Sequence, residues 1–499
     1  MKTFIGRMCI CCILMNLSFS AFAGIDKTEL TGKVTDKNTG EALPGATIFI
    51  PELKTGTTSD LNGMYSISNL PSKKILMQVN LIGYKTLIAT VDMATQHNFD
   101  FQLEVSVKEI NEVVITGSAT AVERNRTPTP MAVVRKTELL QTASTNIIDA
   151  LTSQPGISQV TTGSGISKPV IRGLGYNRVV VVNDNIRQEG QQWGDEHGIE
   201  IDEYGVDRVE ILKGPASLAY GSDAMAGVIN FISAPSPSEG VIHSDFISNY
   251  ESNNGLFGYS INNSGNLHGF VWDARWSQKM AHAYKNKYDG YVFNSGFNEY
   301  NAQTILGFNK SWGYSHLHLS YYHLTPGIVE GERDSATGNF IKPVALNDST
   351  ETMEQASASD YKSYSASVPF QEINHFKAVL NNSIIIKDGT LKSTLGFQQN
   401  NRKEFADALN PNTYGLFFQL NTVNYELKYH FPEIKKINLS AGVNGMYQES
   451  LNKGTEFLVP AYQLFDGGLF VIAARKAGDF DFSGGIRYDH RNVEGTLLL

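Results

Sequence analysis

The sequence predicts an exported, all-β protein of the outer-membrane type. It contains a small β-sandwich, an α+β region and part of an antiparallel transmembrane β-barrel. Three observations in the 499-residue chain predict this class. The chain opens with an export signal, its later segments alternate apolar and polar residues with the period of a β-strand, and short turns alternate with long loops.

Residues 1–23 are predicted to be a signal peptide. Lys2 and Arg7 give a basic start, an apolar run follows from Met8 to Phe19, and Ala21-Phe22-Ala23 fits the A-x-A cleavage rule. The apolar run is too short to span a bilayer as a helix. All three cysteines lie in this leader, so we expect the mature chain to lack disulfides and thiol-ligated metals.

The charge balance argues against nucleic acid as a partner. The formal net charge is −9, and it falls to −11 because two positive charges, Lys2 and Arg7, leave with the leader. No later run approaches about 18 consecutive apolar residues, so no transmembrane helix is expected.

Residues 28–104 have the pattern of short strands with one buried face each. Tyr65 and Ile67 alternate with serines, Phe101 and Leu103 alternate with polar residues, and Asn62-Gly63 is a hairpin signal. The phrases TGKVTDKNTGEALPGATIFI and GTTSDLNGMYSISNLP resemble the carboxypeptidase regulatory-like domain, a transthyretin-like fold. The resemblance implies an accessory module, and no HxxE or HExxH zinc motif of a peptidase is present.

Residues 108–130 contain a β-prone run, EVVITGSA at 112–119, followed by a proline-rich tract. The segment is either a plain linker or an exposed strand that pairs with another protein by β-augmentation. It resembles the TonB box of TonB-dependent receptors. That resemblance implies contact with TonB, which acts with ExbB and ExbD, through Glu112, Val113, Val114, Ile115 and Thr116.

Residues 131–234 combine a short amphipathic helix around Ile147, Ile148 and Leu151 with the strand RVVVVNDN, which is apolar on both faces. Tight turns are expected at Gly214, Pro215, Gly221 and Gly227. PVIRGLGYNRVVVVNDN and VDRVEILKGPASLAYGSDAMAGVINFI resemble the plug domain of TonB-dependent outer-membrane receptors. This order of domains is typical of receptors from Bacteroidetes-like bacteria.

Residues 241–499 are predicted to form part of a barrel. Phe270, Trp272 and Trp276 share one strand face, while Asp273, Arg275 and Ser277 share the other, as expected of a lipid-facing exterior and an aqueous lumen. Short turns are predicted at 263–266, 311–314, 388–389 and 432–436, and long loops at 281–300, 325–374, 406–415 and 452–463. About eleven strands are expected. The family resemblance implies a 22-stranded barrel, so the chain is expected to be its first half, truncated in mid-barrel.

The stretch GQQWGDEHGIEID at 190–202 gathers hard ligands between two plug strands. One interpretation is a metal-binding apex in the lumen, and the other is an acidic loop whose carboxylates cap turns. GDEHGIEID also resembles the plug loop of zinc-type TonB-dependent receptors. His316 and His318 share the lumen-facing side of one predicted strand, and His323 lies where that strand runs out into the longest loop. The predicted metal ligands are Asp195, Glu196, His197, Glu200, Asp202, His316, His318 and His323.

The resemblance implies a TonB-dependent transporter in the outer membrane, in contact with its lipid, that actively takes up a scarce nutrient. We expect a transported metal ion, zinc or copper, with no resident cofactor. A ferric siderophore or haem is the alternative ligand, and a passive binding protein or adhesin is the alternative class. No nucleophile–base or metal–base constellation is recognisable, so we do not expect an enzyme.

Overall fold

The computed structural model describes residues 27–106, 113–114, 122–123, 130–142, 144–190, 194–214, 217–478 and 480–495. The predicted signal peptide lies outside these residues. The chain divides into two compact units, one centred on residues 27–106 and one on the later chain. Among the described residues, no helix is long and apolar enough to cross a membrane.

The N-terminal unit is a β-sandwich of two sheets, with strand orders β4-β1-β7 and β3-β2-β5-β6. The alternation predicted for this unit is confirmed, since Tyr65 and Ile67 are buried between exposed serines. The strands are β1 (Lys27–Asp36), β2 (Thr47–Ile50), β3 (Thr55–Thr58), β4 (Met64–Pro71), β5 (Lys74–Asn80), β6 (Leu87–Asp92) and β7 (Phe101–Leu103).

The hairpin predicted at Asn62-Gly63 is wrong. The strands on either side of it, β3 and β4, belong to different sheets, and β4 pairs with β1 instead. Asp60 stabilises the turn, because its Oδ1 accepts hydrogen bonds from the backbone N–H groups of Asn62 at 2.8 Å and Met64 at 2.9 Å. The dipeptide therefore signals a turn but does not choose the partner strand.

The plug region of the second unit is built on a five-stranded sheet of order β10-β15-β16-β13-β14, beside a separate β11-β12 hairpin. Its strands are β10 (Met131–Arg135), β11 (Ile157–Gly163), β12 (Ile166–Ile171), β13 (Val179–Asn183), β14 (Ile186–Arg187), β15 (Val206–Lys213) and β16 (Gly227–Ser233). Its helices are α2 (Lys136–Gln141), α3 (Ile147–Leu151), η3 (Tyr176–Arg178), η4 (Glu203–Gly205) and α4 (Ser217–Tyr220).

The plug core follows the sequence pattern closely. Val179–Val182 are all buried, as predicted for a strand that is enclosed on both faces. The short helix is α3, and the side chain of Asn146 caps its start by accepting from the N–H of Asp149. Gly227 has a φ of +149°, and a Cβ there would lie 2.0 Å from the carbonyl oxygen of Leu212, so only glycine fits. Pro215 lies outside the described residues.

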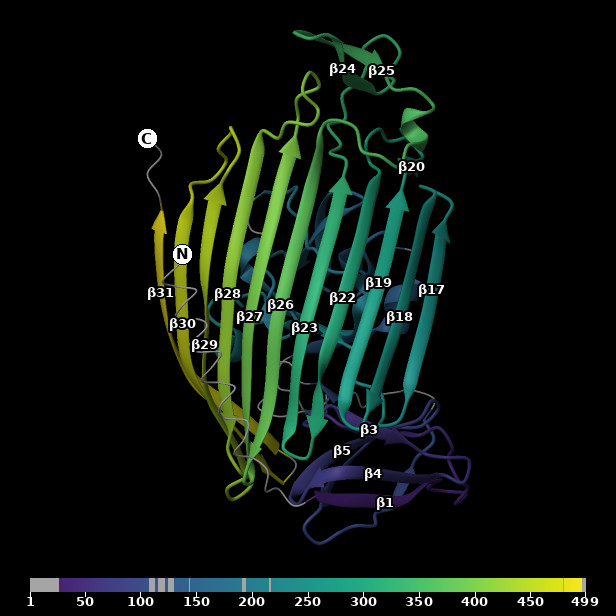
Figure 1. Cartoon of the computed structure of the whole chain (residues 1–499), viewed down its shortest axis with the longest axis vertical. Coiled ribbons are helices and arrows are strands. Elements are labelled where there is room, and N and C mark those ends of the chain that lie inside the picture. Colours follow the sequence, from purple (N-terminus) through teal and green to yellow (C-terminus); the bar gives the residue numbers. More distant parts are fainter. Residues whose placement is uncertain are drawn as a thin grey trace. The chain divides into compact units, whose positions relative to one another are not determined.

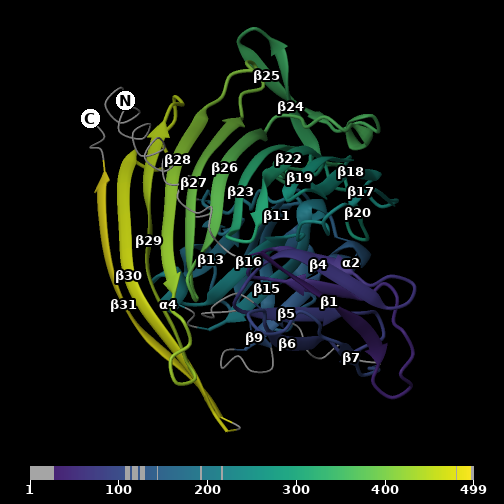
Figure 2. The ribbon, with the colours of Figure 1, turned by 60° about the horizontal axis from the view of Figure 1, so that its bottom comes forward.

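Eleven long strands form one antiparallel sheet in which neighbours along the chain are neighbours in space (Figure 1). The sheet curves around the plug elements, which lie against its inner face (Figure 2). The strand count agrees with the sequence, whereas a total of twenty-two stays a prediction. The strands are β17 (Ile242–Glu251), β18 (Leu256–Leu267), β19 (Phe270–Ala281), β22 (Phe297–Lys310), β23 (Gly313–Pro326), β26 (Phe370–Ile386), β27 (Gly389–Phe405), β28 (Leu416–His430), β29 (Ile437–Asn452), β30 (Tyr462–Ala477) and β31 (Phe480–Gly495).

Strand β19 has the predicted two-faced character. Arg275 and Ser277 are buried on the inner face, whereas Phe270 and Trp276 are at least 40% exposed on the outer face. The turn predicted at 263–266 is wrong, because β18 continues to Leu267 and the chain turns at His268-Gly269. Ser264 and Asn266 face the inside of the sheet, and the sequence pattern misassigned them to a loop.

The long connections carry small structures of their own at one end of the sheet. They contain β20 (Lys285–Asn286) paired with β21 (Gly290–Tyr291), β24 (Ile341–Asn347) paired with β25 (Thr350–Gln355), and η5 (Asp360–Lys362). Val292, Phe293 and Phe340 form a buried apolar cluster between two of these loops. The segments 406–415 and 453–461 connect strands at the same end, close to the predicted bounds.

Candidate functional site

The segment from Gly194 to Asp202 connects β14 to η4 and lies near the loop-bearing ends of the strands. His197 contacts Glu404, which is one residue from the end of β27, and Phe418, which is near the start of β28. Gly198 lets the segment pack closely on β12, since a Cβ there would lie 2.9 Å from the backbone nitrogen of Ser167. We call residues 194–202 the plug apex.

His197 is the centre of the plug apex, and its side chain is only 1% exposed. Its Nε2 lies 3.1 Å from Glu404 Oε1, and its Nδ1 accepts a hydrogen bond from the N–H of Gly194 at 3.4 Å. These contacts place the imidazole proton on Nε2. Burial, followed by the positive charge of Arg402, lowers the pKa of His197 to about 4, so the ring is neutral at physiological pH.

Two carboxylates lie on the same turn as His197. Asp195 is exposed and accepts a hydrogen bond from the hydroxyl of Tyr176. The carboxylate of Glu196 and the imidazole of His197 border the same side of Gly194, because a Cβ on that glycine would lie 3.2 Å from Glu196 Oε2 and 3.9 Å from His197 Nε2. The turn therefore groups two carboxylates with one imidazole, whose Nδ1 and Nε2 both take part in hydrogen bonds within the protein.

Lys168 of β12 contacts this turn through its ammonium group. Its Nζ donates a hydrogen bond to the carbonyl of Gly194 and lies 4.6 Å from the centre of the Tyr176 ring. Burial lowers the pKa of Lys168 to about 8, and the negative charge of Asp195 opposes that shift.

Glu200 belongs to a buried network between the plug and the sheet. Arg402 Nη2 donates to Glu200 Oε1 at 2.5 Å, Arg402 Nη1 donates to Gln371 Oε1 at 2.7 Å, and Gln371 Nε2 donates to Glu404 Oε1 at 2.9 Å. His375 Nδ1 lies 3.4 Å from Glu200 Oε2. Burial alone would raise the pKa of Glu200, but His375 and Arg402 outweigh it and lower the pKa. The charge of Glu200 is thus matched within the protein.

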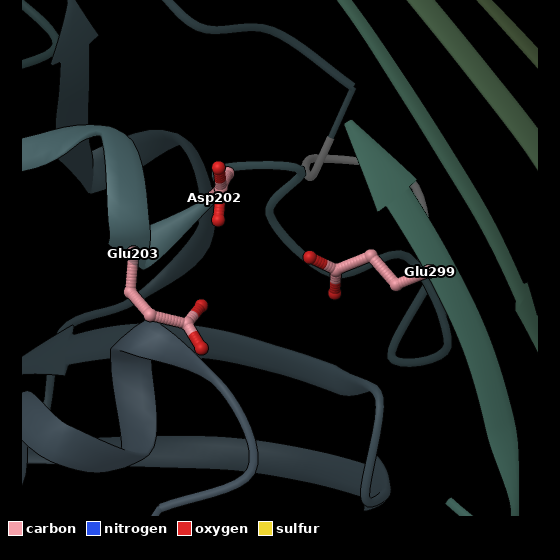
Figure 3. Close-up of side chains that lie close together, drawn as sticks. All are labelled: Asp202, Glu203 and Glu299. Carbon is pink, nitrogen blue, oxygen red and sulfur yellow. The ribbon is translucent and has the colours of Figure 1, made fainter. Parts of the chain in front are cut away.

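Asp202 is turned toward a different part of the sheet. Its Oδ2 accepts from the hydroxyl of Ser277 at 2.7 Å, and its Oδ1 accepts from the N–H of Tyr204 at 3.1 Å. It forms a group with Glu203 and Glu299, shown in Figure 3.

Two family models match the chain. Residues 30–115 match the CarboxypepD_reg-like domain, and residues 123–228 match the TonB-dependent Receptor Plug Domain. The plug match covers the apex and both strands that flank it. The chain carries the plug domain of the TonB-dependent receptors.

Known proteins resemble this receptor over part of their length. It is 32% identical over 134 residues to an iron-regulated outer membrane virulence protein of Vibrio cholerae, covering 26% of this chain and 20% of the relative. It is 30% identical over 247 residues to TonB-dependent receptor P39 of Formosa agariphila, covering 46% of this chain and 22% of the relative. The chain therefore spans about a fifth of the length of these relatives.

Among solved structures, the FrpB iron transporter from Neisseria meningitidis resembles the receptor with a TM-score of 0.57 at 16% sequence identity. The superposition covers 73% of this chain and 59% of FrpB. At this identity the likeness supports the fold, and the fold is that of an outer-membrane β-barrel receptor with an internal plug.

The wall histidines of the receptor fall into two groups. His316 and His318 face inward from β23, with ring centres 6.3 Å apart, and His318 Nδ1 lies 3.2 Å from Asp184 Oδ1. His323 lies within β23 and faces the opposite side, where it stacks on Tyr300 at 4.4 Å. The strand ends at Pro326, close to the predicted start of the long loop, and its odd-numbered residues face outward, so His323 does not share the face of His316 and His318.

The structure does not bring the eight predicted metal ligands of the receptor together. Within the described ranges, the group with three converging ligand atoms is Asp202, Glu203 and Glu299, of which only Asp202 was predicted. Metal binding at the other positions stays a prediction. Sequence reasoning missed Glu404, Arg402 and Gln371. The first two belong to an inward-facing row with two-residue spacing on β27, and this spacing was the available signal.

The predicted TonB contact of the receptor is described in part. Val113-Val114 forms strand β8 and pairs antiparallel with β9 (Val122–Glu123), with Val114 opposite Val122. Glu112, Ile115 and Thr116 lie outside the described residues. The contact with TonB itself stays a prediction.

Proposed function

We propose that this receptor is a TonB-dependent outer-membrane transporter that takes up a metal ion, with zinc first and copper second. TonB, acting with ExbB and ExbD, would supply the energy by pulling on the segment that contains Val113-Val114. The plug family match and the position of the plug against the inner face of the sheet support transport.

One observation carries the choice of a metal ion. At the plug apex a neutral imidazole, His197, lies beside the carboxylate of Glu404, and Asp195 and Glu196 share the same turn. Zinc and copper bind neutral imidazole readily, and carboxylate oxygens complete such sites. Calcium and magnesium prefer sites made of oxygen alone, so the imidazole favours a transition metal.

An iron complex is the second candidate ligand. The relative from Vibrio cholerae is described as iron-regulated, and FrpB is described as an iron transporter. A ferric siderophore or haem would contact the loops and the exposed part of the apex, and its binding would depend less on one imidazole. A passive binding protein or adhesin is the alternative class, and it requires no energy from TonB.

Calorimetric titration of the receptor purified from outer membranes with Zn²⁺, Cu²⁺ and a ferric siderophore tests the ligand. His197→Ala should weaken Zn²⁺ binding at least tenfold, or about 1.4 kcal/mol. His243→Ala is the matched control, since it removes an exposed imidazole of β17 that pairs with Asp245 and should leave affinity unchanged. Unchanged zinc affinity in His197→Ala, or binding of the siderophore alone, would overturn the zinc proposal.

A further inference from the structure

A second set of ligand atoms lies where the plug meets the sheet, away from His197. Asp202 and Glu203 belong to the plug and Glu299 belongs to β22, and their ligand atoms all lie within 4.8 Å of one another. Figure 3 shows the three carboxylates facing one another across this boundary. No imidazole belongs to the group, so its chemistry differs from that of the plug apex.

The charges in this group do not balance. Lys279 Nζ lies 2.8 Å from Glu203 Oε2 and 3.3 Å from Glu299 Oε2, and it is the ammonium in direct contact with the carboxylates among the described residues. When all three carboxylates are ionised, one positive charge against three negative charges leaves two uncompensated. The side chains of Lys279 and Glu299 are only 3% and 4% exposed, and uncompensated charge is costly at such burial.

An unpartnered oxygen provides an independent indication of a ligand. Asn301 is 5% exposed, and its Nδ2 donates to Glu299 Oε1 at 2.9 Å and approaches Ser277 Oγ at 3.4 Å. Its Oδ1 has no hydrogen-bond partner among the described residues. Turning the amide over would break the bond to Glu299, so the oxygen is correctly placed and needs a donor or a cation.

The space beside these residues can hold such a ligand. Asn301 and Asp202 line one cavity of about 50 Å³, together with Gln188, whose Oε1 also lacks a partner within the described part of the chain. A single water needs about 10–15 Å³ on the same scale, so the cavity accommodates an ion with some of its water. The unpartnered atoms at its wall are the acceptor oxygens of Asn301 and Gln188, which suit a cation or its bound water.

We propose that Asp202, Glu203, Glu299 and the Oδ1 of Asn301 bind one divalent, oxygen-preferring cation of the calcium class. Carboxylate and amide oxygens are the ligands that Ca²⁺ takes in proteins. Two positive charges match the two uncompensated negative charges. Since Asp202 and Glu203 come from the plug and Glu299 from the wall, the cation ties the plug to the barrel. This role is independent of the transported ion.

Thermal unfolding of the receptor purified from outer membranes, stripped with a chelator and titrated with Ca²⁺, tests the site. A saturable rise in Tm is expected, and Mg²⁺ should act only at higher concentration. Glu299→Gln should lower the apparent Ca²⁺ affinity at least tenfold. Glu426→Gln is the matched control, because it removes a wall carboxylate of β28 that pairs with Lys428 at 3.2 Å.

A second variant keeps the test decisive if Glu299→Gln folds poorly. Asn301→Ser removes the unpartnered oxygen without changing any charge, and it should also weaken Ca²⁺ binding at least tenfold. The proposal is overturned if Ca²⁺ does not change Tm, if both variants respond like Glu426→Gln, or if acidification of the stripped protein alone reproduces the full stabilisation. The last result would mean that protons neutralise the carboxylates.

Discussion

Asp223 is a plug residue that joins two guanidinium groups. Its carboxylate accepts hydrogen bonds from Arg187 of the plug at 2.6 Å and from Arg491 of β31 at 2.7 Å. Burial alone would raise the pKa of Asp223, but the hydrogen bond from Arg491 and the charge of Arg187 outweigh it and lower the pKa. The carboxylate therefore stabilises the folded receptor at any pH above about 3.9, the unfolded value, and this contribution is lost as the pH falls through the lower folded value.

Asp223→Asn should reduce the free energy of unfolding by about 2 kcal/mol near pH 7, since it removes charge-assisted hydrogen bonds. The difference from wild type should begin to shrink below about pH 4, where the carboxyl of the unfolded chain takes up a proton, and should go on shrinking as the pH falls through the lower folded pKa. Denaturant unfolding of both proteins from pH 3 to pH 7 measures this. A difference that stays constant across that range would show that the charge of Asp223 is not the cause.

At the same scale, sequence reasoning located the plug apex but not its contacts. The crowding of donors around His197 was visible in thirteen residues, whereas its partner Glu404 is 207 positions further along the chain. Only the docking of the plug against β27 brings the two together, and no local pattern specifies that docking. The pairing of Glu200 with Arg402 was hidden for the same reason.

At the scale of elements, alternation predicted the strands well because each strand of the sheet separates two different environments. Alternation failed where polar residues could indicate either a turn or the inner face of a strand. Ser264 and Asn266 are polar because they face the inside of the sheet, and the stretch 263–266 was mistaken for a turn. The end of β23 was predicted within two residues, but His323 near that end faces outward, away from His316 and His318.

Substitutions at Val114 of strand β8 test how the receptor binds TonB. If TonB pairs with the backbone around Val114, the side chain matters less than the ability to form a ladder. Val114→Pro removes a ladder N–H and should abolish binding of a purified TonB C-terminal fragment, while Val114→Ile should bind like wild type. Fluorescence titration of the receptor with labelled fragment makes the comparison. Equal damage from both variants would rule out backbone pairing.

At the scale of the whole molecule, the order of segments was the strongest signal in the sequence. A sandwich, a short β-prone strand, a plug and a β-sheet with alternating short and long connections together favour an outer-membrane receptor, and the family models and the eleven-stranded sheet agree. Under the proposed function, the choice of ligand rests on a few side chains at the apex, so the same architecture is compatible with several substrates.

Uptake of radioactive zinc by zinc-starved cells tests the central claim most directly. Cells that produce the receptor are compared with cells whose receptor lacks residues 112–119, with surface-bound and internal zinc measured separately. The account predicts that the deletion abolishes internal accumulation and leaves surface binding intact, because TonB would supply the energy and the plug apex the site. Equal accumulation with and without the deletion, or no zinc accumulation by the intact receptor, would contradict it.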